Sequence, residues 1–211
     1  MSKPRHRDFP RILIVEGYSD LAVYAELLDY LGKNTPQRVH IEMLGGRSTL
    51  ETSLETFINP GLLAEKTHIG VIVDADADGQ RAANRIAATL RRLTDQQVRE
   101  NAWTPATTAK PRIGLLVVPE PAAPGELEDI LWNAWADAPA NTHAKQCVES
   151  FVECMAQKSS LRARSPVKGR LGALLAILND DDPRPGPAAK ARCFDFAQPH
   201  YKRIVDFLNG F

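Results

Sequence analysis

RILIVEG, at residues 11–17, and IGVIVDADADG, at residues 69–79, are the two stretches that decide the fold. Each begins with a short apolar run, which is typical of a strand that is buried on both faces. A helical pattern follows each stretch and ends near Leu31 in the first case and near Leu93 in the second. Because neighbouring parallel strands need a crossover, usually a helix, this order predicts a mostly parallel sheet.

Two more strands and one more helix complete this pattern. Strands are predicted at residues 39–44 and 113–118, and a helix at 48–57. The polar connection at residues 95–112 carries Pro and Trp and is predicted to be an unstructured surface insertion, since such long connections are uncommon inside a core. We therefore expect an α/β core at residues 1–123, with helices on both faces of the sheet, as in TOPRIM-like and Rossmann-like folds.

The strand patterns stop after Pro124. Residues 124–211 are predicted to form a helical extension packed on the core, with a break at NDDDPRPGP, residues 179–187. The expected helices span residues 126–136, 142–157, 166–178 and 201–211.

Composition excludes several classes of protein. The chain has 211 residues, 44% of them hydrophobic, and its 26 basic and 26 acidic residues give a formal net charge of +0, so it is a folded globular protein whose bulk charge identifies no partner. It has no apolar run long enough to span a bilayer, and MSKPRHRDFPR at the start lacks the apolar region of a signal peptide, so we expect a cytoplasmic protein without a membrane partner. Three cysteines without C-x-x-C spacing argue against a disulfide framework and a structural zinc site.

Acidic residues stand where the predicted strands end. Glu16 follows the first strand, Asp74 and Asp76 follow the third, and Asp78 begins the next helix. In open α/β sheets, ligands bind beyond the carboxyl ends of the strands, near the point where the strand order reverses. If these two strands are neighbours, the carboxylates converge and must bind a proton or a cation to coexist.

Hard oxygen ligands select Mg²⁺ or Mn²⁺, and such an ion leaves coordination positions for a phosphodiester. The predicted chemistry is therefore phosphoryl transfer or hydrolysis. The competing interpretation is that these acids only complement helix dipoles, and this alternative is strongest for Asp78.

Further candidates lie in three segments. PGELEDIL, residues 124–131, places acids in the first turn of a helix, where they suit the dipole; alternatively one of them, Glu128, completes a second metal site. Gly45, Gly46 and Arg47 precede a helix and form either a phosphate-binding loop or a plain tight turn. From two basic segments we select Arg81 and Lys168 as phosphate contacts, although a solvated surface is the commoner explanation of such segments.

VEGYSD at residues 15–20 and IVDADADG at residues 72–79 resemble the TOPRIM domain of topoisomerases, bacterial primases and OLD-type nucleases. The resemblance covers residues 11–120. It implies that Glu16 is a general acid or base and that a D-x-D pair, here Asp74 and Asp76, holds Mg²⁺. It also implies functional positions for Asp20, the last residue of an E-G-x-x-D signature, and for Asp78, the third aspartate of the type II topoisomerase pattern.

The chain is more closely similar to a small family of uncharacterised TOPRIM-related proteins. The shared features are IVEGYSD, the pair Gly45-Gly46, IVDADADG, PAAPGELEDIL and the tail VKGRLGALLAILNDDDPRPG. The tail departs from that family at Lys168-Gly169-Arg170, where the family has Lys followed by Ala.

Within this resemblance, a topoisomerase would need a further domain with a strand-cleaving tyrosine, and a primase a further catalytic subdomain. We therefore expect an Mg²⁺- or Mn²⁺-dependent phosphodiesterase or nuclease that acts on nucleic acid. The alternative is a non-catalytic module that holds a metal, a nucleotide or nucleic acid and acts with a partner protein. A phosphatase fits less well, because its nucleophilic aspartate would follow the first strand, where this chain has Glu16. The sequence does not decide whether the substrate is DNA or RNA, or whether the protein forms a homo-oligomer.

Overall fold

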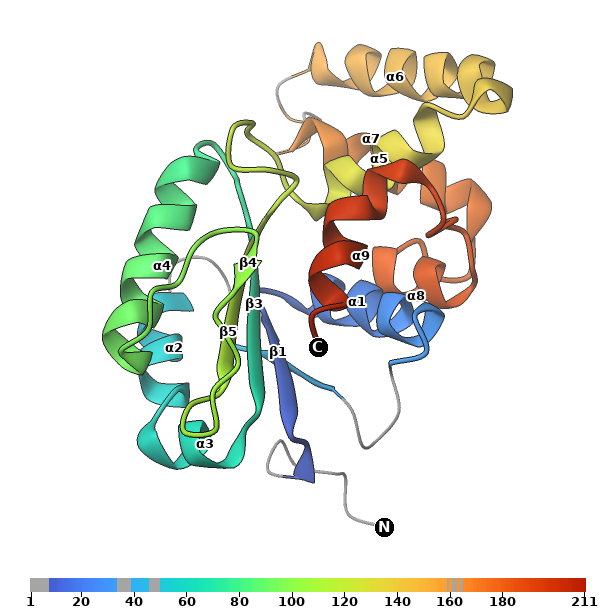
Figure 1. Ribbon diagram of the computed structural model, residues 1–211. Helices are drawn as coiled ribbons and strands as arrows, with labels where there is room; N and C mark the ends of the chain where they lie inside the picture. The colour runs from blue at the N-terminus through green and yellow to red at the C-terminus, as the bar shows by residue number, and fades with distance from the viewer. Residues whose placement is uncertain (1–7, 34–38, 46–49, 159, 161–162, 164) are drawn as a thin grey trace.

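The computed structural model describes residues 8–33, 39–45, 50–158, 160, 163 and 165–211. It is an α/β structure in which helices cover both faces of a five-stranded, mostly parallel sheet (Figure 1). The strands are β1 Arg11–Val15, β2 His40–Met43, β3 His68–Asp74, β4 Ala102–Trp103 and β5 Arg112–Val118.

The strand order β2-β1-β3-β5-β4 determines where a ligand can bind. β1 pairs in parallel with β2 and β3, and β3 pairs in parallel with β5, which confirms that the first and third apolar runs are neighbours. The chain moves from β1 to β2 on one side and then to β3 on the other. The strand order therefore reverses between β1 and β3, and residues at their carboxyl ends border the crevice formed there.

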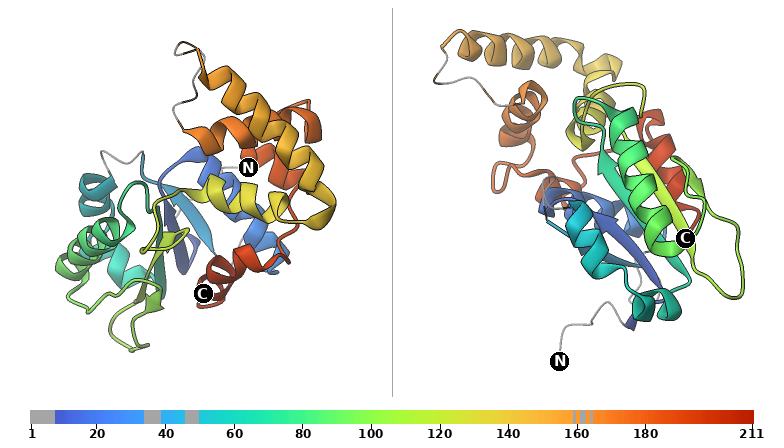
Figure 2. Two further views of the ribbon diagram at one scale, coloured as in Figure 1. Left: turned by 90° about the horizontal axis from the view of Figure 1, so that it is seen from above. Right: turned by 90° about the vertical axis from the view of Figure 1, so that its left-hand side faces the viewer.

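The helices form two layers. One face of the sheet carries α2 to α4, and the other carries α1, α5 and α7 to α9, while α6 lies outermost, against α7 (Figures 1 and 2). The bounds are α1 Tyr18–Tyr30, α2 Leu50–Phe57, α3 Pro60–Glu65, α4 Gly79–Thr94, α5 Leu127–Ala136, α6 Thr142–Ala156, α7 Pro166–Leu178, α8 Pro185–Lys190 and α9 Lys202–Leu208, with 3-10 turns at Pro139–Asn141 and Pro199–Tyr201.

The strands are buried on both faces, as their apolar runs predict. Alternate residues face opposite layers: Ile12 and Ile14 pack with α2 to α4, whereas Leu13 and Val15 pack with α1 and the helices after Pro124. The residues after Pro124 thus share one core with the sheet. Among the helices of the described ranges, none has both the length and the apolar character that a membrane crossing requires.

The prediction of an unstructured insertion at residues 95–112 is wrong, because this segment contains β4, which pairs antiparallel with β5. The Trp103 ring stacks on Phe207 at 5.0 Å between centroids and meets Phe211 edge-on at 4.8 Å. A two-residue strand has no visible period, and its partners lie at the far end of the chain, so local sequence gave no signal for it.

Three helical segments also differ from the expectation. α3 was not among the expected helices; the Asn59 side chain accepts a hydrogen bond from the Leu62 amide and caps it. The Pro-rich break at residues 179–187 contains the start of α8, which packs on α1. The last helix ends at Leu208 and is preceded by a 3-10 turn.

Candidate functional site

Glu16 and Asp74 meet at the carboxyl edge of the sheet. Glu16 is the first residue after β1, and Asp74 is the last residue of β3. The Glu16 Oε1 atom accepts a hydrogen bond from the Asp74 backbone amide at 3.1 Å, and both side chains are half-buried. The convergence that the strand order predicts for these two residues is present.

The start of α5 faces the same point. The Asp74 Oδ1 atom accepts a hydrogen bond from the backbone amide of Leu127, the first residue of α5, at 2.9 Å. Glu126 is the N-cap residue of α5, and its amide donates to Asp129 Oδ2 at 2.9 Å. The acid-rich first turn of α5 is thereby held against the end of β3.

Three carboxylates come together as a result. One side-chain oxygen each from Asp74, Glu126 and Glu128 lie within 4.8 Å of one another, and we call these three side chains the carboxylate cluster. Glu128 is only 8% exposed, so it is a buried acid rather than a solvated one. The sequence pointed to Glu128 but not to Glu126, although the position of Glu126 directly before an acid-rich helical turn was a usable signal.

A backbone bridge fixes the two loops that carry the cluster. The Asp76 amide donates to the Gly125 carbonyl and the Gly125 amide donates to the Asp76 carbonyl, both at 2.7 Å. Gly125 has a φ of +147°, and a Cβ atom there would lie 2.9 Å from Asp129 Oδ2 and 2.9 Å from Pro119 Cδ. Glycine is therefore required at this position.

Asp76 and Asp78 have different surroundings from Asp74. In an extended segment Asp74 and Asp76, two residues apart, would point the same way, but Asp76 has a φ of +53°, so the segment is not extended there. Asp78 is exposed, and its Oδ1 atom accepts the Arg81 amide at 2.9 Å as the N-cap of α4. The helix-terminus interpretation therefore describes Asp78 in this structure.

Asp20 also has a local structural role. Its Oδ2 atom accepts a hydrogen bond from the Gly17 amide at 2.8 Å and closes the start of α1. Burial raises the pKa of the Asp20 carboxyl above its ordinary value.

The cluster has a high electrostatic cost. Burial raises the pKa of Asp74 well above its usual range, and the negative charges of Asp20, Glu16 and Glu128 raise it further, while the Leu127 amide lowers it. Burial also raises the pKa of Glu128. Carboxylates in such a place gain strongly from a bound cation.

Lys168 of α7 is a cation at the cluster. Its Nζ atom lies 2.6 Å from Glu126 Oε2 and 3.5 Å from Glu128 Oε1. Burial lowers the pKa of Lys168, but the hydrogen bond to Glu126 and the charge of Glu128 outweigh burial, so the pKa lies above its ordinary value and the ammonium stays charged. The Ser165 hydroxyl donates to Glu126 Oε1 at 2.5 Å and caps α7. The predicted phosphate contact Lys168 is thus paired with carboxylates.

An open groove of about 570 Å³ adjoins the cluster. It lies between the Asp76–Gly125 bridge and the start of α7, and Asp76, Glu126 and Arg170 all line it. The Arg170 guanidinium lies over the Trp132 ring, 5.7 Å from its centroid, and 3.8 Å from Glu149. The groove therefore brings acidic and basic groups to one open surface.

Two of the other predicted phosphate contacts, Gly45 and Arg81, lie in the described part of the chain and are not among the residues of the cluster. Gly45 follows β2 with a φ of +85°, whereas Gly46 and Arg47 lie outside the described residues. Arg81 is exposed on the first turn of α4. Elsewhere on α4, Arg85 and Arg92 form ion pairs with Glu51 and Glu55 of α2, which neutralise part of this basic helix.

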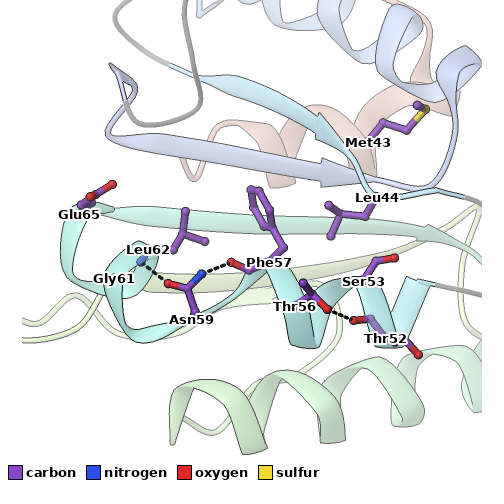
Figure 3. Close-up of a pocket in the computed structure, with 10 residues that line it drawn as sticks. All are labelled: Met43, Leu44, Thr52, Ser53, Thr56, Phe57, Asn59, Gly61, Leu62 and Glu65. Carbon is purple, nitrogen blue, oxygen red and sulfur yellow. Dashed lines mark hydrogen bonds between the residues drawn. The ribbon is translucent and has the colours of Figure 1, made fainter.

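A second groove, of about 740 Å³, lies between β2, α2 and α3 (Figure 3). Its polar side chains include Thr56, which donates to the Thr52 carbonyl, and Asn59, which caps α3. Glu65 is its one ionisable lining residue among those described. The smaller groove beside the carboxylate cluster is therefore the better candidate for chemistry, despite its smaller volume.

Comparison with known proteins gives a family but no function. Neither the search of curated proteins nor the search of solved structures found a significant match. One family model, described as "Protein of unknown function (DUF3226)", matches residues 10–211, which is nearly the whole chain. The chain therefore belongs to the DUF3226 family.

Proposed function

We propose that this protein is a TOPRIM-type, Mg²⁺- or Mn²⁺-dependent phosphodiesterase or nuclease that acts on nucleic acid. The observation that carries the proposal is the convergence of Asp74, Glu126 and Glu128 within 4.8 Å at the point where the strand order reverses. The position supports a ligand site, and the burial of the acids supports a cationic ligand.

The donor atoms suit Mg²⁺ or Mn²⁺. All three side chains offer carboxylate oxygens, which are hard ligands, and no histidine or cysteine belongs to this group among the described residues. When bound, such an ion would offset the charge that develops on the phosphate oxygens during cleavage.

The groove gives a place for the substrate. A phosphodiester lying there would meet Arg170 and the start of α7 on one side and Glu126 on the other. Lys168 reaches the same carboxylates from α7, so both cations stand where a phosphate would need its charge balanced. Because Arg170 and Lys168 would contact the phosphate and not a base, this arrangement supports recognition of the nucleic-acid backbone without sequence preference.

Glu16 is the proposed proton-transfer residue. Hydrolysis adds water to phosphorus and breaks the bond to one ester oxygen, so the water must lose a proton and the leaving oxygen must gain one. Glu16 lies beside Asp74 at the mouth of the crevice, and a positioned carboxyl group can make such a transfer. Asp20 contributes negative charge and shapes the start of α1.

The relation to TOPRIM domains is part of this proposal. Glu16 and Asp74 occupy the strand ends that the resemblance assigns to the acid or base and to the first metal ligand. The described arrangement differs at the second residue of the D-x-D pair, because Glu126 of α5 joins Asp74 and Glu128 in the cluster and Asp76 does not.

A cleavage panel tests the proposal. Single- and double-stranded DNA and RNA are incubated with the protein and Mg²⁺ or Mn²⁺, and the wild type is compared with Asp74→Asn and with Asp206→Asn. Asp206 is an exposed residue of α9 that pairs with Lys202 and does not line the groove, so its substitution is a matched change of charge outside the site. We expect metal-dependent cleavage by the wild type and Asp206→Asn, and a loss of at least about 100-fold in Asp74→Asn.

The competing function is a non-catalytic module that holds a metal or a nucleic-acid end beside a partner protein. The ion pair of Lys168 with Glu126 and Glu128 favours this alternative, since it already balances part of the negative charge. Binding of Mn²⁺ and nucleic acid by the wild type, without cleavage of any substrate in the panel, would select this function over hydrolysis.

A further inference from the structure

A buried tyrosine lies within electrostatic reach of the carboxylates. Tyr24 of α1 is 2% exposed, and its hydroxyl group has no hydrogen-bond partner among the described residues. A buried hydroxyl without a partner has lost its hydrogen bonds to water and gained none in return, so native proteins seldom keep one without a reason.

The position of Tyr24 connects it to the metal site. It lies one helical turn after Asp20, and it shares its hydrophobic core with Leu127 and Val167, which stand next to Glu128 and Lys168 in the sequence. The helix starts that supply the cluster and its lysine thus belong to the same hydrophobic core as this tyrosine.

The hydroxyl also lies within electrostatic reach of the acids. Burial raises the pKa of Tyr24 well above its ordinary value, and the charges of Asp20, Asp74, Glu128 and Glu16 raise it further. The hydroxyl therefore keeps its proton, and it is a hydrogen-bond donor within electrostatic reach of four acceptor side chains.

We propose that Tyr24 is a positioning residue of the metal site: when a divalent cation is bound, its hydroxyl donates a hydrogen bond to the carboxylate cluster from the core side. The inference rests on the proposed function. Carboxylates that hold metals are themselves usually held by hydrogen bonds, and the loss of such a support typically lowers metal affinity about 10–100-fold. Tyr24 would supply this support from α1, whereas the Leu127 amide supplies it to Asp74 from α5.

The test is Tyr24→Phe, which retains the ring and removes only the hydroxyl. Isothermal titration with Mn²⁺ should show an affinity at least about tenfold lower than that of the wild type. Without metal, the free energy of unfolding should be unchanged or higher, because the variant no longer buries an unpaired hydroxyl. If the hydroxyl only stabilised the fold, Tyr24→Phe would bind Mn²⁺ as the wild type does, and its free energy of unfolding would be lower.

Tyr201→Phe is the matched control. Tyr201 is 1% exposed, and its hydroxyl also lacks a partner among the described residues. It lies at the start of α9, and its pKa is raised by burial and by the negative charge of Asp195, not by the acids of the cluster. This variant should bind Mn²⁺ as the wild type does.

The two proposals fail in different ways. If wild-type protein does not bind Mn²⁺, the proposed function is wrong and Tyr24 has no metal site to support. If the wild type binds Mn²⁺ and Tyr24→Phe binds it equally well, or loses stability without losing affinity, the role of Tyr24 is wrong and the metal site stands.

Discussion

The Asp74 carboxylate accepts a hydrogen bond from the Leu127 amide at 2.9 Å, which joins the end of β3 to the start of α5 across 53 residues. This contact brings the one strand-end aspartate of the cluster to Glu126 and Glu128. It also places a buried acid at a helix N-terminus, where the positive end of the dipole partly offsets its charge.

Replacing Asp74 should stabilise the protein and abolish its response to metal. Asn keeps an acceptor for the Leu127 amide but removes a buried charge, so Asp74→Asn should raise the free energy of unfolding at neutral pH by about 0.5–2 kcal/mol. Urea unfolding measures this change, and Mn²⁺ should raise the melting temperature of the wild type and of Asp206→Asn but not that of Asp74→Asn. Asp206→Asn should lie within about 0.5 kcal/mol of the wild type.

The gain from Asp74→Asn should depend on pH. The folded-state pKa of Asp74 is raised above 3.8 by burial first and by neighbouring charges second, so the folded wild type holds this proton more tightly than the unfolded chain. Wild-type stability therefore falls as pH rises from about 4 through the folded-state pKa. The variant should have no advantage at low pH and its full advantage above that range; an advantage that is constant with pH would contradict this account.

Lys168→Gln should separate metal binding from catalysis. Removing an ammonium that lies 2.6 Å from Glu126 removes a competitor for the carboxylates. Mn²⁺ affinity, measured by titration calorimetry, should rise about fivefold, because a charge several Å away in a solvated place contributes about 1 kcal/mol. Cleavage should fall, since the phosphate loses a cation. Lower metal affinity in this variant would count against the arrangement of the site.

Gly125→Ala should disturb the bridge between the two acidic loops. The backbone conformation and the contacts with Asp129 and Pro119 predict a loss of about 1–3 kcal/mol in the free energy of unfolding, together with weaker Mn²⁺ binding. Gly172→Ala is the control. Gly172 is an exposed residue of α7 with nothing within 4 Å of its added Cβ, so this change should stabilise the protein by about 0.5–1 kcal/mol. Equal effects of both changes would show that Gly125 has no special role.

His68 should make the protein sensitive to mild acid. Burial lowers the pKa of His68 to about 4 from 6.5, and the charges of Arg11, Arg112 and Lys33 lower it further. The unfolded chain therefore binds a proton first, and stability is lost as pH falls from 6.5 towards 4. Because His68 is partly exposed, we expect a loss of only about 1 kcal/mol. Urea unfolding of His68→Gln at pH 7 and pH 5 should therefore show a smaller loss of stability than the wild type. If both proteins lose the same free energy of unfolding between these pH values, His68 is not the cause of the acid sensitivity.

The sequence predicted the parts of the fold that have local signals. β1, β3 and β5 are apolar runs, and α4 carries a clear helical pattern, so these elements needed no tertiary information. β4 was missed because Trp103 is held by Phe207 and Phe211 from the end of the chain. α8 was missed because it is six residues long and begins among prolines.

The residues of the site likewise divide into those with a local sequence signal and those that depend on tertiary contacts. Glu16 and Asp74 were predictable because strand ends in a parallel sheet meet at one edge. The roles of Glu126 and Lys168 depend on the meeting of the starts of α5 and α7, which is a tertiary contact that no local pattern contains. Asp76 follows the same strand as Asp74 in the sequence, but no local pattern showed that its backbone is left-handed and turns away from the strand direction.

The most direct test of the central claim is anomalous diffraction from crystals of the protein soaked in Mn²⁺, with data collected at the manganese edge. We expect an anomalous peak among the side chains of Asp74, Glu126 and Glu128, and no peak there in crystals of Asp74→Asn. A peak elsewhere, or no peak in wild-type crystals at Mn²⁺ concentrations that saturate binding in solution, would contradict the claim that this carboxylate cluster is a metal site.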